Sequence, residues 1–211
     1  MISYNSMIVP SLIFVAGLAR NVGAQQGPPA VEAGASQLAL ASIPAKGGAT
    51  LTVTTPAFKA GGDIPFENTQ YKGNVFPGLS WTAGPAGTKS YAIIMQDGDA
   101  MRNGAPILHW TMVNIPASVT KLDAGMTSPP AGSEYGPNIR GASQPYTGPR
   151  TPPGPKHRYH LQVFALGTAI ALSSKATYAD LTDAMKGQVL ASGEVIGLGR
   201  APDDAGGQTS H

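Results

Sequence analysis

Two acidic side chains, Asp97 and Asp99, flank a glycine shortly after an apolar run that ends at Met95. Side chains two residues apart point to the same face if a strand continues through them, so this pair could form a negatively charged site for an amine or a metal ion. Asp and Gly are also common turn formers, and a polar turn that closes the strand explains the same residues. The spacing alone leaves a binding site and a turn as alternatives.

A histidine, His109, precedes Trp110 at the start of another apolar run. Imidazole donates or accepts a hydrogen bond and titrates near neutral pH, which suits a ligand site. Histidine is also intermediate in its frequency of burial, so a core position beside the tryptophan is the alternative.

The third cluster covers residues 146–159, with the sequence YTGPRTPPGPKHRY. Gly148-Pro149 and the following prolines predict a stiff loop that runs straight into a strand. On that strand His157 and Tyr159 share one face, whereas Arg158 and His160 share the other. Imidazole and phenol both donate hydrogen bonds to phosphate oxygens, so the loop and the His/Tyr pair predict the rim of an anion site. A proline-rich surface loop without a ligand is the alternative.

Metal and hydrolase chemistry have little support in the sequence. The chain has no cysteine, which excludes thiolate ligands and thiol nucleophiles. His157 and His160 lie three residues apart, and on a strand this spacing puts them on opposite faces, which disfavours a shared metal ion. The sequence shows no zinc-hydrolase helix motif, no nucleophile elbow and no phosphate-binding loop. We therefore expect no cofactor, no metal site and no catalytic residues.

The overall composition favours a loop-rich β protein. Glycine and proline supply 27 and 19 of the 211 residues, and they interrupt helices and fill turns. Hydrophobic residues make up 42%, enough for a core, and charged residues only 12%. The formal net charge is +2 with no basic run, which argues against nucleic acid as a partner.

Short apolar or alternating runs identify the elements that must position these clusters. One helix is expected at 177–186, where Thr177 and Asp180 fit a capping box. A connector of unusual length, residues 117–156, separates two of the strands, and connectors of this length are usually functional or disordered. The expected fold is mainly β, a sandwich with a few short peripheral helices. Strands are expected at 51–54, 91–95, 109–115, 159–166 and 188–196.

The two ends of the chain have a different character from the body. Residues 1–24 resemble a signal peptide, with an apolar stretch at 7–19 and a small-residue cleavage pattern at 22–24. The apolar stretch is shorter than the roughly 20 residues that a membrane span needs. No membrane span is therefore expected in the mature chain. Residues 25–37 look like a linker, 38–200 form the folded domain and 201–211 a flexible tail. The expected location is periplasmic or secreted, and cytoplasmic if residues 1–24 are not a signal peptide.

Taken together, the clusters resemble the phosphatidylethanolamine-binding protein family, also called the Raf kinase inhibitor-like family, in its bacterial branch. Many short stretches match in the same order, which is more specific than one motif. Gly98 and Met101 stand where the family usually has prolines. The matching stretches include Thr54-Thr55-Pro56-Ala57-Phe58, Leu79-Ser80-Trp81, Asp97-Gly98-Asp99-Ala100, His109-Trp110, Val113-Asn114-Ile115-Pro116, Gly148-Pro149 and His157-Arg158-Tyr159.

The resemblance implies a Greek-key β-sandwich of two antiparallel sheets with a small pocket for a phosphate or phosphoryl head group. No arginine or lysine matches a pocket position, so the resemblance implies a modest field and weak anion binding. The histidines and Tyr159 would donate to the phosphate, with backbone N–H groups near Gly148. The implied ligand-binding residues are Asp97, Asp99, His109, Gly148, Pro149, His157 and Tyr159.

The function that follows from the resemblance is non-enzymatic binding of a phosphorylated small molecule or phospholipid head group, with modulation of a protein partner as a consequence. Two alternatives stay open: a hydrolase of phosphate or acyl esters built on the Asp/His pocket, and a protein-interaction module in which the connector at 117–156 carries recognition. Turnover of phosphoesters and titration with phosphate distinguish these readings.

Overall fold

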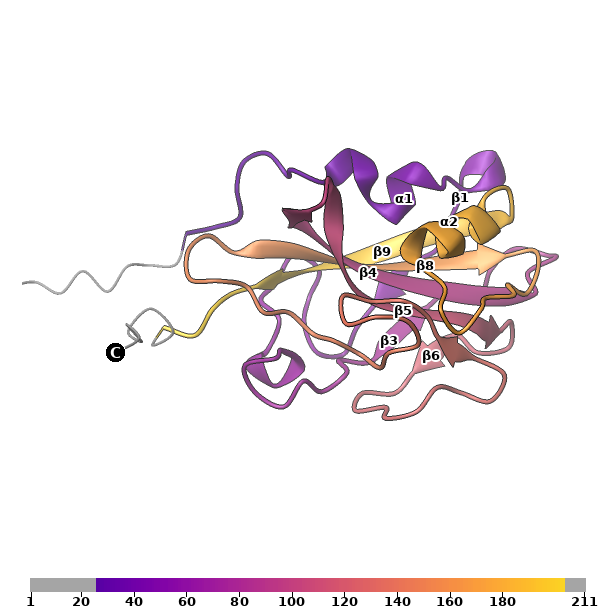
Figure 1. The fold of residues 1–211 in the computed structure, drawn as a ribbon. Coiled ribbons are helices and arrows are strands. Elements are labelled where there is room, and N and C mark those ends of the chain that lie inside the picture. The colour runs from indigo at the N-terminus through magenta and orange to yellow at the C-terminus, as the bar shows by residue number, and fades with distance from the viewer. Residues whose placement is uncertain (1–25, 204–211) are drawn as a thin grey trace, which may run out of the picture.

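A computed structural model describes residues 26–203 of the chain. It contains a six-stranded sheet in the order β1-β9-β8-β4-β5-β7 and a three-stranded sheet in the order β2-β3-β6 (Figure 1). All neighbouring strands are antiparallel except the two-residue β1, which runs parallel to β9. The strands are β1 Ala49–Thr50, β2 Val53–Thr54, β3 Leu79–Trp81, β4 Ser90–Arg102, β5 Ala105–Pro116, β6 Lys121–Leu122, β7 Glu134–Tyr135, β8 His157–Leu166 and β9 Val189–Gly199.

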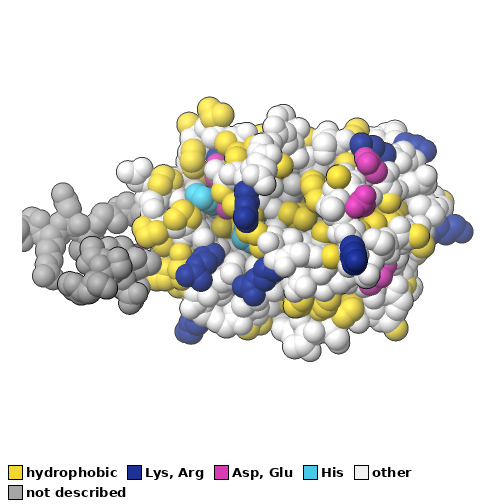
Figure 2. Space-filling model, in the orientation of Figure 1, with side chains coloured by type: hydrophobic (Ala, Val, Ile, Leu, Met, Phe, Trp, Pro, Cys, Tyr) yellow, Lys and Arg dark blue, Asp and Glu magenta, His cyan; other side chains and the backbone are white. Residues whose placement is uncertain are grey.

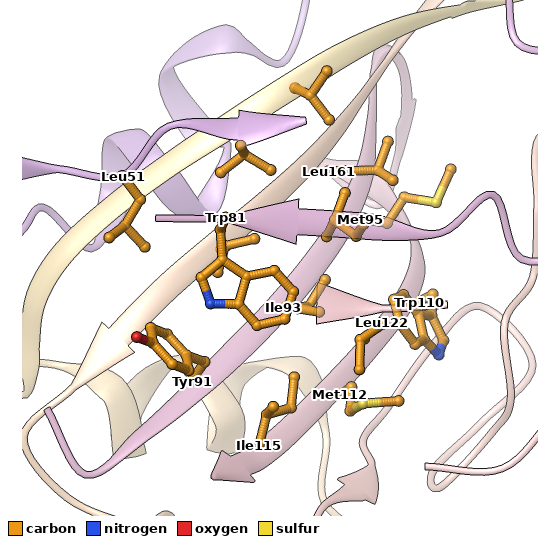
Figure 3. Packing of buried hydrophobic residues seen from close by; sticks show 14 of the residues in the cluster. Leu51, Trp81, Tyr91, Ile93, Met95, Trp110, Met112, Ile115, Leu122 and Leu161 are labelled. Carbon is orange, nitrogen blue, oxygen red and sulfur yellow. The ribbon is translucent and has the colours of Figure 1, made fainter. Parts of the chain in front are cut away.

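The main core lies between the two sheets. Alternate residues of β4, β5 and β8 point to the small sheet because successive side chains of a strand point to opposite faces. Trp81 of β3 and Leu122 of β6 pack against Ile93 of β4 and its neighbours, all in one buried cluster (Figure 3). The two-sheet arrangement confirms the expected mainly β sandwich, whereas its Greek-key connections stay a prediction.

The outer face of the large sheet is covered by helices α1 (Ala39–Ser42) and α2 (Tyr178–Met185), which lie on the opposite side of the sheet from β3 and β6 (Figure 1). Leu181 and Met185 of α2 are fully buried in a second cluster with Ile94 and Phe164 of the sheet. The predicted helix is confirmed: Thr177 is the N-cap, and it exchanges hydrogen bonds with Asp180 in a capping box. Three 3-10 turns complete the helical structure of residues 26–203: Ala35–Gln37, Lys46–Gly48 and Phe66–Asn68.

Three neighbouring strands of the large sheet, β8, β4 and β5, place the site. In the register of β4, Asp97 lies opposite Tyr159 of β8 on one side and Ile107 of β5 on the other. Two interruptions of this register matter below: one between Met95 and Gln96, and one after Asp97. The connector at 117–156 contains only the short strands β6 and β7 and otherwise runs as loops over the sandwich.

The segment expected to be a linker contacts the domain where the structure describes it, from residue 26. The Gly34 N–H donates to the Gly98 carbonyl oxygen at 2.9 Å, and the Glu32 carboxylate lies 2.6 Å from a ring nitrogen of His160. We call residues 26–37 the N-terminal arm. The proposed signal peptide, residues 1–24, lies outside the described residues, as does the tail from residue 204. None of the described helices is long and apolar enough to cross a membrane.

Candidate functional site

A cavity of about 460 Å³ opens at one end of the sandwich, beside the ends of β4, β5 and β8. Four of the seven residues expected at the site line it: Asp97, His109, His157 and Tyr159. Asp99, Gly148 and Pro149 do not. The remaining lining residues were not identified from the sequence and are Gln70, Ala100, Ile107, Ile139, Arg140, Arg150 and Pro152.

Asp97 and His157 form the polar centre of this cavity. The His157 Nδ1 lies 2.8 Å from Asp97 Oδ2, and the other oxygen, Oδ1, accepts the backbone N–H groups of Asp99 and Ala100 at 3.0 and 3.1 Å. The hydrogen bond to Asp97 raises the pKa of His157, against the opposing effect of burial. Since Nδ1 is engaged by the carboxylate, Nε2 is the ring nitrogen that is left to donate to a ligand.

His109 reaches the cavity because of a β-bulge. Met95 pairs with Trp110 and Gln96 with Leu108, so His109 is the extra residue of β5 between them. Strict alternation would turn His109 away from the core face that Trp110 occupies, and the bulge turns both side chains to the same side. A bulge has no clear signature in the sequence at this position, so the placement follows only from the fold.

Burial of the His109 ring favours its neutral form. Its Nδ1 lies 3.1 Å from the Gly148 carbonyl oxygen and 3.3 Å from that of Thr147, so Nδ1 carries the proton and donates. Burial lowers the pKa of His109. The expectation that this ring donates to a phosphate changes accordingly: in the neutral tautomer Nε2 is an acceptor, which suits a hydroxyl or a protonated phosphate oxygen.

Tyr159 completes the floor of the cavity. Its hydroxyl lies 3.0 Å from Thr151 Oγ1, and its ring packs edge-on against His109 with the centroids 5.1 Å apart. Burial raises the pKa of Tyr159, and the charge of Asp97 acts in the same direction, so the group is a neutral phenol. A phenol both donates and accepts, which lets Tyr159 serve a ligand oxygen beside Thr151.

Gly148 and Pro149 support the site from behind and do not line it. The Gly148 N–H donates to Asn74 Oδ1 at 2.7 Å, so it is not free for a ligand, contrary to the expectation. A Cβ on Gly148 would lie 2.4 Å from the Asn68 carbonyl oxygen, so this position needs glycine for the close approach of two backbones. The carbonyl oxygens of Gly148 and Pro149 accept hydrogen bonds from the side chain and the backbone N–H of Gln70, respectively.

Asp99 lies on the other side of the sheet from Asp97, although the two residues are spaced for a common face. The register of β4 is interrupted after Asp97, and Asp99 bonds the guanidinium of Arg158 at 2.5 and 2.8 Å. Arg158 shares its face of β8 with His160, as the alternation predicted. Among residues 26–203, no group of three or more His, Asp or Glu side chains is arranged to hold a metal ion.

Two arginines, Arg140 and Arg150, also line the cavity, although no arginine or lysine matches a pocket position of the family. Arg140 and Arg150 come from loops that a strand-based interpretation of the sequence could not place. The sequence did contain a signal for one of them. Arg150 lies between Pro149 and Thr151, in the segment that was expected to form the rim of the site. Figure 2 shows histidine side chains at this end of the molecule with Lys and Arg side chains around them.

Comparisons with known proteins agree with this architecture. Residues 54–200 match the model of the family described as phosphatidylethanolamine-binding protein. A UPF0098 protein of Methanothermobacter thermautotrophicus is 38% identical over 155 residues, covering 71% of this chain and 99% of the relative. The crystal structure of Escherichia coli YbcL, described as a new member of the mammalian PEBP family, superposes with a TM-score of 0.66 at 30% identity, covering 73% of this chain and all of YbcL.

A third relative is a mycobacterial protein. LppC of Mycobacterium tuberculosis, whose name marks it as a candidate lipoprotein, is 36% identical over 139 residues, covering 65% of this chain and 66% of LppC.

Proposed function

The chain belongs to the phosphatidylethanolamine-binding protein family, and from this premise we propose that it is a non-enzymatic binding protein whose cavity holds a phosphoryl group. The ligand is a phosphorylated small molecule or a phospholipid head group. The observation that carries the proposal is the convergence of Asp97, His109, His157 and Tyr159, from three neighbouring strands, on one cavity. A polar set of this kind in a largely apolar concave site is what ligand pockets require.

Binding would centre on His157. Asp97 holds the ring in one orientation and favours its charged form, so Nε2 presents a positively charged donor. The Tyr159 hydroxyl provides a second, neutral donor. Because Asp97 is almost wholly buried and already accepts three hydrogen bonds, it acts as a positioning group for His157 and does not act as a nucleophile.

We propose that the protein works outside the cytoplasm, in the periplasm or as a secreted protein. The apolar stretch and small-residue pattern within residues 1–24 support this location, and LppC offers a parallel among the relatives. Modulation of a protein partner by the ligand-bound form is part of the same proposal, in line with the mouth of the cavity opening on the surface.

Titration with phosphate and phosphoethanolamine, followed by NMR, tests the binding role. We expect His157→Ala to weaken binding about ten- to a hundred-fold, because a hydrogen bond between charged groups is lost. The control is Lys121→Gln, which removes one positive charge on β6, away from the cavity. Equal affinities of the wild type and His157→Ala would refute the assignment.

The hydrolase alternative is tested on the same protein. A panel of phosphate and acyl esters is incubated with the chain, with and without added divalent metal ions. Turnover that disappears in Asp97→Asn and His157→Ala would replace the binding role by catalysis, whereas saturable binding without turnover supports it.

A further inference from the structure

Two guanidinium groups are held at the rim of the cavity by two successive residues. Arg140 Nη2 donates to Gln70 Oε1 at 2.9 Å, and Gln70 is itself fixed by Nε2 donating to the Gly148 carbonyl oxygen at 2.7 Å. The Arg150 guanidinium lies over the ring of Tyr71, 5.8 Å from its centroid. Tyr71 in turn donates its hydroxyl to the Thr151 carbonyl oxygen. The segment Gln70-Tyr71 therefore orders both arginines beside the same opening.

Positive side chains outnumber negative ones among the residues that line the cavity. Two guanidinium groups face one carboxylate, that of Asp97, which leaves an excess of one positive charge among the lining residues even when His157 is neutral. The hydrogen bond to Asp97 favours the charged form of His157, which adds to this excess. Asp97 is not free to attract a ligand cation, since its side chain is only 3% exposed and both its oxygens accept hydrogen bonds. An ammonium group would find no free carboxylate among the lining residues and would meet two arginines at the rim.

The remaining wall is apolar. Ile107 of β5, Ile139 of the loop beside Arg140, and Pro152 line the cavity together with Ala100. These side chains offer no hydrogen bonds to polar substituents, and they gain from contact with an apolar group. A ligand that fits this lining has two parts. Its highly charged end would contact the arginines and His157, and its uncharged organic part would contact the isoleucines.

We propose that the cavity selects phosphomonoesters, whose terminal phosphate carries nearly two negative charges, over phosphodiesters, which carry one. The proposal rests on the phosphoryl site proposed above and names the ligand class of that site. A guanidinium pairs with two phosphate oxygens at once, and a monoester has three unsubstituted oxygens to share between two arginines and His157. A diester has two such oxygens and one negative charge fewer, so the same donors hold it less tightly.

Methyl phosphate and dimethyl phosphate are the matched probes, because they differ by one methyl group and one charge. At pH 7.5 the monoester is close to a dianion. We expect the wild-type chain to bind methyl phosphate about tenfold more tightly than dimethyl phosphate in an NMR or calorimetric titration. In the double variant Arg140→Gln/Arg150→Gln this preference should fall to near unity, mainly through weaker binding of the monoester.

The control is Lys121→Gln, which lowers the net charge without touching the cavity and should keep the tenfold preference. Equal binding of the two probes by the wild type, or a preference that survives in the double variant, overturns the selectivity while leaving the phosphoryl site in place. Failure of the wild type to bind either probe overturns the phosphoryl site and the selectivity with it.

A last arm distinguishes the source of the monoester. Vesicles containing phosphatidic acid present a terminal phosphate on a lipid, and vesicles containing phosphatidylethanolamine present a diester. Sedimentation of the chain with the first and not the second supports the selectivity and identifies a lipid source. Binding of soluble methyl phosphate without sedimentation on either vesicle supports a soluble ligand. Stronger sedimentation with phosphatidylethanolamine overturns the proposal.

Discussion

Glu32 Oε1 and His160 Nε2 lie 2.6 Å apart, although 128 residues separate them in the chain. The other ring nitrogen, Nδ1, lies 2.8 Å from Glu194 Oε2 of β9. A histidine with a carboxylate at each ring nitrogen satisfies both when it is an imidazolium, because both nitrogens then donate. This contact holds the N-terminal arm against the outer face of the large sheet. His160 lies on β8, and the same strand presents His157 to the cavity from its other face.

The first prediction concerns the pH dependence of stability through His160. Burial lowers the pKa of His160, but the hydrogen bond to Glu194 and the charges of Glu194 and Glu32 outweigh it and raise the pKa. A raised pKa stabilises the fold fully below the unfolded value of about 6.5, and this stability is lost as the pH rises through the folded value. Each unit of elevation contributes about 1.4 kcal/mol.

Thermal unfolding of the wild type and His160→Gln between pH 5.5 and 9 measures this contribution. The difference in Tm should be largest at the acidic end and shrink as the pH rises. The comparison between variants is necessary because burial lowers the pKa of His109, which acts in the opposite direction, while His157 acts in the same direction as His160. A difference in Tm that does not change with pH would contradict the prediction.

The second prediction concerns the attachment of the arm. Glu32→Ala removes the carboxylate that bonds His160, so the arm should separate more often from the sheet. Hydrogen exchange at the Gly34 amide, which bonds the Gly98 carbonyl oxygen, should speed up by about tenfold for each 1.4 kcal/mol lost. Glu67→Ala, at an exposed carboxylate elsewhere, is the control and should leave this amide unchanged.

The third prediction explains why residue 98 is glycine here. A Cβ at Gly98 would lie 1.6 Å from Glu32 Oε1, so Gly98→Ala must displace the Glu32 side chain. We expect a loss of about 1–3 kcal/mol in the free energy of unfolding, the usual range for overpacking.

The double variant Gly98→Ala/Glu32→Ala tests the cause. With the carboxylate gone, the nearest atom to the new methyl group is His160 Nε2 at 3.1 Å, a much milder contact, so Gly98→Ala should cost far less in the Glu32→Ala background than in the wild type. Additive losses in chemical denaturation would show that the clash with Glu32 is not the reason for glycine.

The fourth prediction concerns the Asp97–His157 pair. Asp97→Asn removes the negative charge that raises the pKa of His157 and replaces the carboxylate by a neutral amide, while burial, which lowers the pKa, stays. The pKa of His157, followed by NMR, should therefore fall. Phosphate affinity above neutral pH should fall with it, since His157 is then a neutral donor. Asp63→Asn, which breaks the exposed pair with Lys156, should change neither quantity.

Local sequence determined much of the frame. Alternation along β8 places His157 and Tyr159 on one face and Arg158 and His160 on the other, because the period of a strand is two regardless of its surroundings. The capping box at Thr177 and Asp180 likewise depends on residues three apart. Such features are decided by near neighbours, and the sequence is sufficient to predict them.

The positions of three side chains at or near the site depend on contacts with distant segments, so only the tertiary structure decided them. The bulge at His109 arises from pairing β5 with β4, and it turns the ring into the cavity against the simple alternation. Asp99 leaves the site because Arg158, on a strand 59 residues away, takes its carboxylate. Arg140 reaches the rim because Gln70 holds it across 70 residues. These contacts join parts of the chain that become neighbours only when the sheets pair and the loops fold over them, so no local pattern in the sequence could reveal them.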